Sequence, residues 1–497
     1  MIASHSSGDY APIICSLGPI WLAVLLSIVL VGVNILKCGS TRSGKSYSAI
    51  SDVLKVADQR DTAIVVCDPH GKSLARPLIG HLIARGHRHR IRFDQFANFQ
   101  HMLQWEFIRK SIAESFAERE AEDEETKRFF SNILVRQQGG GALGSSPLKE
   151  EWVMKALALY INQRILPGED KLFYVYEPKS KWFNKMIRDC DTSIIVGQEA
   201  VQPFLDIQNG LIPASKYEPA KRLIQNVCSS PAFKYRCEGA GGFNLESFLD
   251  NKGILLVEGE NKGKVSPEAM RTMFGAIVHL VIRYVRTRPK PYPRVALILD
   301  EATNAKLITN TEKEAAAECQ KYGLDMTIMV QLLDFPTTQI RDGILANCIW
   351  HQWFYNASPY VIRKAADDLG ANMDKDKIEA IRELKVGERW NKYRDKVWQD
   401  RAPELPDPYG LPGLTEKKIQ QALEQMYQLP DYRDLTEQCH SNSTITETET
   451  TQYSNEPPTT SASPDISMNS SPADRLNTED LYGSETENDE DCGSSEP

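Results

Sequence analysis

The residues of this chain best suited to chemistry are the eight from Gly39 to Ser46, GSTRSGKS, which match the G-x-x-x-x-G-K-[S/T] pattern at every fixed position. Small residues in such a loop let successive backbone N–H groups point at phosphate oxygens, and the helix that follows presents its positive N-terminus to them. A lysine at position 45 can reach the β- and γ-phosphates, and the Ser46 hydroxyl can ligate Mg²⁺. The pattern predicts that a nucleoside triphosphate and Mg²⁺ are held by Gly39, Ser40, Thr41, Arg42, Ser43, Gly44, Lys45 and Ser46.

A second group with chemical potential follows the apolar run RVALIL, where Asp300 and Glu301 stand side by side. In P-loop enzymes an aspartate at the end of such a strand holds Mg²⁺. An adjacent glutamate within hydrogen-bond reach can polarise the attacking water. Standing alone, the pair would more simply cap a helix after an ordinary strand. Together with the loop, it predicts a metal ligand in Asp300 and a catalytic base in Glu301.

Two more polar residues end predicted strands, Asp68 in VVCDPHGK and Gln331 in TIMVQ. Because the carboxyl ends of parallel strands meet at one edge of a sheet, we expect both side chains to lie near Ser46 and Asp300. Polar residues at strand ends are common, so each is weak by itself. Their joint occurrence predicts a cofactor contact for Asp68 and a γ-phosphate sensor in Gln331.

The elements that must position these residues alternate between strands and helices. A helix-compatible run, YSAISDVLKVADQ, follows the loop, and a long one begins at Pro267. This alternation predicts an α/β fold with a parallel sheet. The predicted strands lie at 33–36, 62–72, 89–94, 248–259, 293–302, 324–331 and 347–356.

Other parts of the chain have a different character. Helical periodicity dominates between about Trp105 and Phe243, which predicts an all-helical insertion. The segment from Arg382 to Glu404 is expected to form a β-hairpin that turns near Gly387, and TEKKIQQALEQMYQL is expected to form one more helix. From Ser441 the chain is rich in Ser, Thr, Asn and Glu and poor in aromatic residues, which predicts disorder.

The net charge of −9 over 497 residues is unevenly distributed. From Ser441 onward there are 13 acidic residues and a single basic one, Arg475, so the tail carries −12 and the preceding 440 residues carry +3. A mildly basic body neither demands nor excludes nucleic acid. The ten cysteines are scattered and include no C-x-x-C pair, which is typical of reduced, mostly structural thiols in a cytosolic compartment.

Residues 11–33 are almost wholly apolar and long enough to span a bilayer. No Lys or Arg precedes them, whereas Lys37, Arg42 and Lys45 follow, an asymmetry that would leave the ATP-binding part in the cytoplasm. We expect this segment to anchor the protein in the inner membrane. Because it runs directly into the strand before the loop, part of it could instead be core β-structure.

The motifs GSTRSGKS, VVCDPHGKSLARPLIGHL, GILLVEGENKGKVSPEAMRTMFGAIV, LILDEATN and KYGLDMTIMVQ occur in an order that resembles the FtsK/HerA superfamily of P-loop ATPases. Within it, the chain is most similar to the TraG/TraD-like coupling ATPases of conjugative type IV secretion. The resemblance covers roughly Val33 to Glu404. The Walker motifs are shared by many ATPases, whereas the DPHG strand and the strand-end glutamine are more discriminating.

The resemblance implies a RecA-like motor that assembles as a homo-hexamer and uses ATP and Mg²⁺ to pump DNA, with a relaxase or a secretion channel as further partners. It assigns Lys45 and Ser46 to nucleotide and metal, Asp300 to the metal, Glu301 to catalysis and Gln331 to sensing. The expected organisation is an apolar segment (1–32), a RecA-like domain (33–104 and 244–404), an all-α insertion (105–243), a helical extension (405–440) and a disordered acidic tail (441–497).

Two features depart from the family pattern. Membrane-bound coupling proteins usually have a longer region before the P-loop. They also use an arginine from a neighbouring subunit, whereas this chain has no Arg between Glu301 and Arg341. Lys321 lies near the expected position, but a lysine cannot reproduce the bidentate fork of a guanidinium group. The residue that acts in trans is therefore unassigned.

Alternative functions remain open on the sequence alone. One is a soluble HerA-like ATPase of DNA processing or packaging, which an apolar N-terminus that does not bind membranes would favour. Another is a nucleotide-binding scaffold with little turnover, motivated by the missing arginine. The acidic tail would dock a DNA-processing partner in the coupling protein, or would simply aid solubility.

Overall fold

The computed structural model describes residues 32–71, 74–108, 115–136, 147–193, 195–238, 242–259, 263–370, 375–406, 411 and 414–434. Most of the apolar segment (11–31) and the whole acidic tail (441–497) lie outside these residues, so the expectations for them stay predictions.

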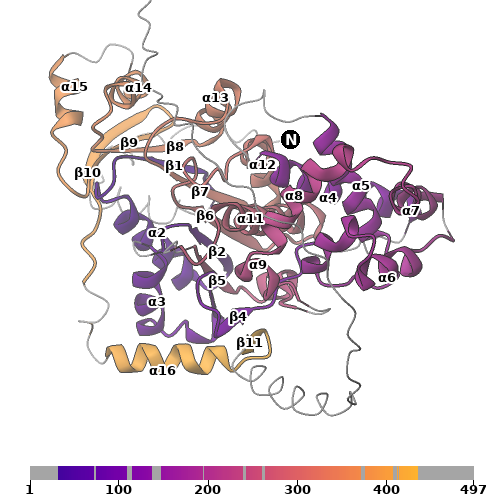
Figure 1. Cartoon of the computed structure of the whole chain (residues 1–497). Helices are drawn as coiled ribbons and strands as arrows, with labels where there is room; N and C mark the ends of the chain where they lie inside the picture. Colours follow the sequence, from indigo (N-terminus) through magenta and orange to yellow (C-terminus); the bar gives the residue numbers. More distant parts are fainter. Residues whose placement is uncertain are drawn as a thin grey trace, which may run out of the picture. The chain divides into compact units, whose positions relative to one another are not determined.

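A nine-stranded sheet forms the centre of the fold, in the order β10-β9-β8-β1-β7-β6-β2-β5-β3 (Figure 1). Its strands from β8 to β3 are parallel, and β9 and β10 form an antiparallel hairpin at one edge. The predicted α/β class with a mostly parallel sheet is confirmed. The strands are β1 (Ile35–Cys38), β2 (Thr62–Asp68), β3 (Ile91–Gln95), β4 (His101–Leu103), β5 (Ile254–Glu258), β6 (Arg294–Leu299), β7 (Leu324–Val330), β8 (Trp350–Phe354), β9 (Glu388–Tyr393), β10 (Lys396–Arg401) and β11 (Tyr432–Asp434).

Helices connect the strands and fill the middle of the chain. The α-helices are α2 (Lys45–Gln59), α3 (Ala75–Ala84), α4 (Phe116–Arg136), α5 (Pro147–Ile161), α6 (Lys181–Asp189), α7 (Ile195–Gln208), α8 (Ala214–Cys228), α9 (Pro231–Lys234), α10 (Leu245–Asp250), α11 (Pro267–Thr287), α12 (Asn310–Glu318), α13 (Thr338–Asn347), α14 (Pro359–Leu369), α15 (Lys375–Arg382) and α16 (Glu416–Tyr427). The 3-10 helices among the described residues are η2 (Arg88–Arg90), η3 (Glu169–Tyr176) and η4 (Cys319–Tyr322).

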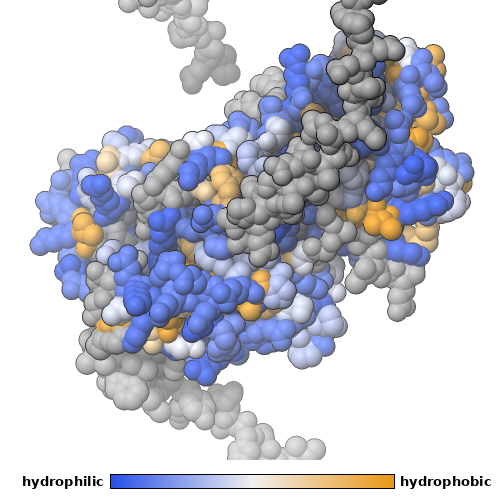
Figure 2. All heavy atoms as spheres, turned by 60° about the horizontal axis from the view of Figure 1, so that its bottom comes forward, coloured by the Kyte–Doolittle hydropathy of each residue, from blue (hydrophilic) through white to orange (hydrophobic). Residues whose placement is uncertain are grey.

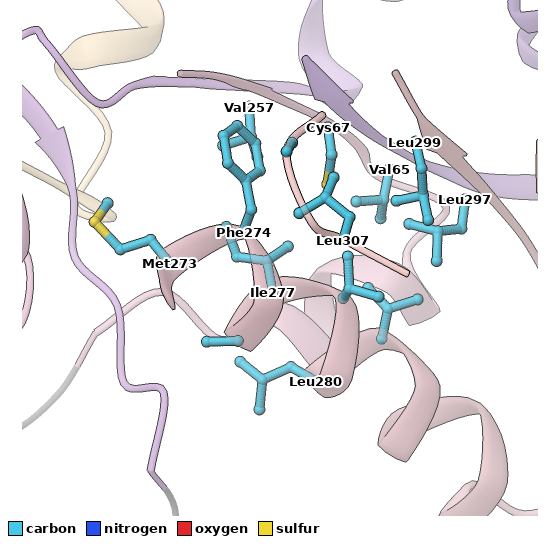
Figure 3. Packing of buried hydrophobic residues seen from close by; sticks show 14 of the residues in the cluster. Val65, Cys67, Val257, Met273, Phe274, Ile277, Leu280, Leu297, Leu299 and Leu307 are labelled. Carbon is cyan, nitrogen blue, oxygen red and sulfur yellow. The ribbon is translucent and has the colours of Figure 1, made fainter. Parts of the chain in front are cut away.

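The central strands are apolar along their whole length because helices cover both faces of the sheet. All residues of β2 are buried. Val65 and Cys67 face α11, where they lie near Phe274 (Figure 3). Ile64, on the opposite face, lines a small apolar space together with Val53 of α2. The continuous apolar runs read from the sequence therefore correspond to strands buried on two sides.

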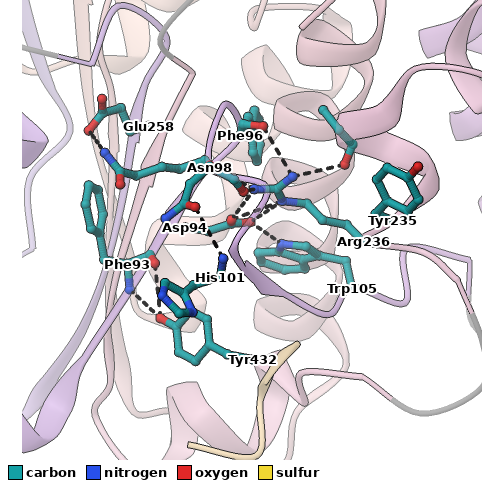
Figure 4. Close-up of polar contacts among 12 residues, drawn as sticks. Phe93, Asp94, Phe96, Asn98, His101, Trp105, Tyr235, Arg236, Glu258 and Tyr432 are labelled. Carbon is teal, nitrogen blue, oxygen red and sulfur yellow. Dashed lines mark hydrogen bonds and ion pairs between the residues drawn. The ribbon is translucent and has the colours of Figure 1, made fainter. Parts of the chain in front are cut away.

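A fully buried ion pair ties edge strand β3 to the helical segment that precedes α10 (Figure 4). Arg236 donates through Nη2 to Oδ1 of Asp94 at 2.9 Å, and neither side chain is exposed. Trp105 donates through Nε1 to the other oxygen of Asp94 at 2.7 Å.

The described part of 105–243 is helical from α4 to α9 apart from connecting turns, 3-10 helix η3 and one isolated bridge between Gln163 and Cys190. Its status as a separate domain stays a prediction.

Two local expectations were wrong, and one small sheet was not predicted. The strand before the loop, predicted at 33–36, is β1 and includes Lys37, because that buried ammonium finds oxygen acceptors on α2 and β8. The hairpin does not turn near Gly387. It turns at Arg394, which has φ 56°, and Gly387 lies at the base of the hairpin. The sequence analysis also missed a small second sheet formed by β4 and β11.

Within the described residues, no helix is both long and apolar enough to cross a membrane. The face of the molecule seen in Figure 2 is mostly hydrophilic, with small separate apolar areas.

Val33, the last residue of the apolar segment, packs in a small cluster with Ile35 and Trp350. At least this end of the segment is therefore part of the protein core.

Candidate active site

The loop from Gly39 to Ser46 is fastened to the carboxyl ends of two neighbouring strands. The Gly39 N–H donates to the Val330 carbonyl of β7 at 3.1 Å. The Ser40 N–H donates to the carbonyl of Tyr355, just after β8, at 2.8 Å. Because β1 lies between β7 and β8, these bonds fix the loop at the edge where all parallel strands end.

Helix α2 begins directly after the loop, and Gly44 occupies its N-cap position with φ 104°. No side chain caps this helix terminus. The first N–H groups of a helix have no partner within the helix and attract anions. A small-residue loop followed by a helix start without a side-chain cap fits the phosphates of a nucleotide, and nucleotide binding by this loop stays a prediction.

Lys45 lies in the first turn of α2, and its side chain is buried over the loop. Its ammonium donates to the carbonyl oxygens of Gly39 and, at 3.1 Å, of Ser40. Burial lowers the pKa of Lys45, while the carboxylates of Glu301 and Asp300 act in the opposite direction. The Lys45 ammonium therefore interacts electrostatically with both predicted catalytic and metal-binding carboxylates, Glu301 and Asp300.

Asp300 follows β6 and is 2% exposed. Its N–H donates to the Cys67 carbonyl of β2 at 2.9 Å, which fixes it at the strand end. Burial, with Asp68 and Glu301 nearby, raises the pKa of Asp300 to about 8, and Lys45 opposes this shift. The carboxylates of Asp300, Glu301 and Asp68 are balanced by the single positive charge of Lys45, so a divalent metal ion would neutralise the remaining negative charge.

Glu301 is held on both oxygens. Its Oε1 accepts from Nε2 of Gln331 at 2.8 Å, and its Oε2 accepts from Nδ2 of Asn304 at 2.9 Å. Its backbone has φ 47°, an uncommon conformation for a residue with a side chain. Such strain tends to persist where the surroundings fix a functional side chain. The structure thus brings Glu301 and Gln331 into direct contact.

Asp68 is fully buried and binds backbone amides. Its Oδ1 accepts from Gly71 N–H at 2.8 Å, and its Oδ2 accepts from Ala75 N–H at 2.9 Å and Leu74 N–H at 3.3 Å. These bonds cap α3. Through its charge Asp68 also acts on Asp300. A direct cofactor contact for Asp68 stays a prediction.

The sequence analysis did not find three polar residues beneath the loop: Lys37, Gln352 and Arg389. Lys37 donates through Nζ to Gln352 Oε1 at 2.5 Å, and Arg389 donates through Nη1 to the same oxygen at 3.0 Å. A lysine in the apolar strand ILKC, two residues before the loop, is the only signal that could have pointed to this network.

Lys321 belongs to η4, immediately before β7 begins. It therefore lies toward the opposite end of the sheet from its own P-loop. No residue that acts in trans can be assigned within one chain.

No protein-family model matches the chain, and no curated protein does. Among solved structures, the bacterial conjugative coupling protein TrwBdeltaN70 in complex with sulphate has a TM-score of 0.55 and 14% identity over 78% of this chain and 90% of that one. The plasmid coupling protein TrwB in complex with ADP and Mg²⁺ has a TM-score of 0.53 and 15% identity over 78% and 89%. VirB4 of Thermoanaerobacter pseudethanolicus has a TM-score of 0.50 and 12% identity over 76% and 90%.

At these identities the likeness concerns the fold. The fold implied by the resemblance of the motifs agrees with the fold of these structures. The chain has the fold of the conjugative coupling protein TrwB and of VirB4.

Proposed function

We propose that this chain is a P-loop ATPase with a RecA-like core, which couples ATP hydrolysis to DNA translocation as a coupling protein of conjugative type IV secretion. The observation that carries the proposal is the contact between Glu301 and Gln331 at 2.8 Å, at the end of the sheet that also holds the P-loop. A loop that only binds nucleotide does not need a carboxylate oriented by hydrogen bonds on both oxygens.

Each residue of the site has a role in this proposal. The loop N–H groups and Lys45 hold the phosphates, and Ser46 and Asp300 hold Mg²⁺, which supplies charge neutralisation at the phosphates when bound. Glu301 orients and deprotonates the attacking water. Gln331, bonded to Glu301, changes the position of that base when the γ-phosphate leaves. One of the similar structures carries ADP and Mg²⁺, which supports ATP and Mg²⁺ as cofactors here.

The partners follow from the same proposal. The chain assembles as a homo-hexamer, binds DNA, and receives its substrate from a relaxase at a secretion channel in the inner membrane, with the part of residues 11–33 that precedes Val33 as the anchor. The similarity to a conjugative coupling protein over most of both chains supports this assignment. A low-turnover nucleotide-binding scaffold is the second candidate, favoured by the absence of Arg between Glu301 and Arg341 in the sequence.

The experiment that tests the proposal is a steady-state ATPase assay of the full chain with and without DNA. We expect ATP turnover that DNA accelerates and that Lys45→Ala abolishes. Turnover that DNA does not change would overturn the motor, and nucleotide binding without turnover would favour the scaffold. Co-sedimentation with membranes that is lost when residues 1–31 are deleted would support the anchor.

A further inference from the structure

The base of the β9–β10 hairpin touches the P-loop directly. The Gly387 N–H donates to the Ser43 carbonyl at 2.9 Å. A Cβ on Gly44 would lie 2.7 Å from both the N and Cα of Gly387, so the two backbones are in close contact. Gly387 itself has φ +84°, and a Cβ there would meet nothing nearer than Arg401 at 3.8 Å. Its conformation, and not crowding, is therefore what requires glycine.

One turn into α2, a buried polar network joins the same hairpin to the loop helix. The Ser48 hydroxyl accepts from Nζ of Lys37 at 2.6 Å and from Nη1 of Arg389. Both cations also donate to Oε1 of Gln352 in β8. Ser48 is thus the point at which β1, α2 and β9 share hydrogen bonds.

The network balances two buried cations with two acidic groups. Asp52 of α2 accepts from Lys37 at 2.7 Å, and Asp400 of β10 accepts from Nε of Arg389 at 2.7 Å. Lys37 is fully buried and Arg389 is 7% exposed. A buried charge that loses its partners is strongly unfavourable, so these contacts fix the position of α2 relative to the hairpin.

The network lies on the other side of the loop from the carboxylates of Asp300 and Glu301. In the sheet, β8 and β9 follow β1 on one side, whereas β7 and β6, which lead to Gln331, Glu301 and Asp300, follow on the other. The loop is therefore held between the side that carries Asp300, Glu301 and Gln331 and the side that carries Gln352 and Arg389.

We propose that Gly387, Arg389 and Ser48 are positioning residues that hold the P-loop and the first turn of α2 in the geometry that binds phosphate. The inference rests on the proposed function and concerns the same site. Disturbing these residues changes the position of the loop N–H groups and of Lys45, which weakens nucleotide binding and leaves the carboxylates in place.

Gly387→Ala tests the first contact, and Gly86→Ala is its matched control. Gly86 has φ +80°, and a Cβ there meets nothing within 4 Å, so both substitutions impose the same backbone strain. We expect both variants to lose similar thermal stability. Only Gly387→Ala should raise the Kd for ADP with Mg²⁺, about tenfold or more.

Ser48→Ala tests the network, with Ser51→Ala as the control, because both serines are buried on α2. We expect Ser48→Ala to raise the KM for ATP about tenfold with kcat changed less than threefold, and Ser51→Ala to change neither. A purely structural role would lower the active fraction, and hence kcat, without changing KM.

The outcomes separate the two proposals. A wild-type chain that binds no ADP overturns both. A chain that binds ADP through Lys45, in which Gly387→Ala and Ser48→Ala match their controls, overturns the positioning role and leaves the proposed function intact. If Gly387→Ala does not fold, the Ser48→Ala result decides alone.

Discussion

Glu301 and Gln331 are joined by a hydrogen bond of 2.8 Å between the end of β6 and the end of β7, two neighbouring strands of the sheet. With the second oxygen of Glu301 held by Asn304 at 2.9 Å, the carboxylate has a fixed orientation. The proposed base is therefore oriented by the proposed sensor, and substitutions of either should affect turnover more than nucleotide binding.

Glu301→Gln is expected to lower kcat by about 10²–10⁴-fold, because an amide cannot accept the proton of the attacking water. The amide oxygen can still accept from Gln331, so the fold and the Kd for ADP should stay within about threefold of wild type. Steady-state kinetics and calorimetric ADP binding measure the two quantities. Unchanged turnover would show that Glu301 is not the base.

Gln331→Glu would place a second carboxylate in contact with Glu301. Two carboxylates at this distance cannot readily both ionise, so they share a proton, and Glu301 becomes a weaker base for the attacking water. We expect turnover to fall at least about tenfold, more than in Gln331→Ala, with ADP binding retained. Gln339→Glu, at an exposed position on α13, is the control. Equal turnover in Gln331→Glu and this control would contradict the assigned contact.

The stability of the protein should depend on pH through Glu169, in η3. This side chain is 2% exposed, and its Oε1 accepts from the Ile108 N–H at 2.8 Å. Burial raises the pKa of Glu169 to about 8. Between the ordinary glutamate pKa of 4.5 and about 8, the native state binds more protons than the unfolded state, so the free energy of unfolding falls as pH rises.

Glu169→Gln removes this titration and keeps an oxygen for Ile108. We expect the variant to be more stable than wild type at pH 8, with the gain absent at pH 4.5. Urea unfolding at the two pH values measures the difference. Glu199→Gln, at an exposed position on α7, should show no such dependence. A gain of equal size at both pH values would mean that Glu169 does not titrate in this range.

The sequence predicted the parts of the site that lie within single segments. The P-loop, Asp300, Glu301 and Gln331 follow apolar strands, and a strand buried on both faces is a strong local signal. The network beneath the loop could not be predicted, because Lys37 and Arg389 meet only after the chain has folded across more than 300 residues. Glycine is typical of hairpin turns, so the sequence predicts a turn near Gly387, whereas the positive φ of Gly387 serves the contact with Ser43.

The Asp94–Arg236 pair should dominate the attachment of the helical segment to the sheet. Besides Asp94, Arg236 donates to the backbone carbonyls of Phe96 and Ala232 at 3.3 and 3.1 Å (Figure 4). Arg236→Met leaves a buried carboxylate with only Trp105 as partner among these groups. Breaking a buried pair in this way costs about 3–5 kcal/mol.

Two comparisons isolate that cost in urea unfolding. Arg188→Met removes an exposed pair with Asp189 and should change the free energy of unfolding by less than about 0.5 kcal/mol. The double variant with Asp94→Asn and Arg236→Met should recover part of the stability lost in Arg236→Met, because no unpaired charge stays buried. A double variant less stable than the single one would mean that the loss comes from packing and backbone contacts of Arg236, and not from the charge that it leaves behind.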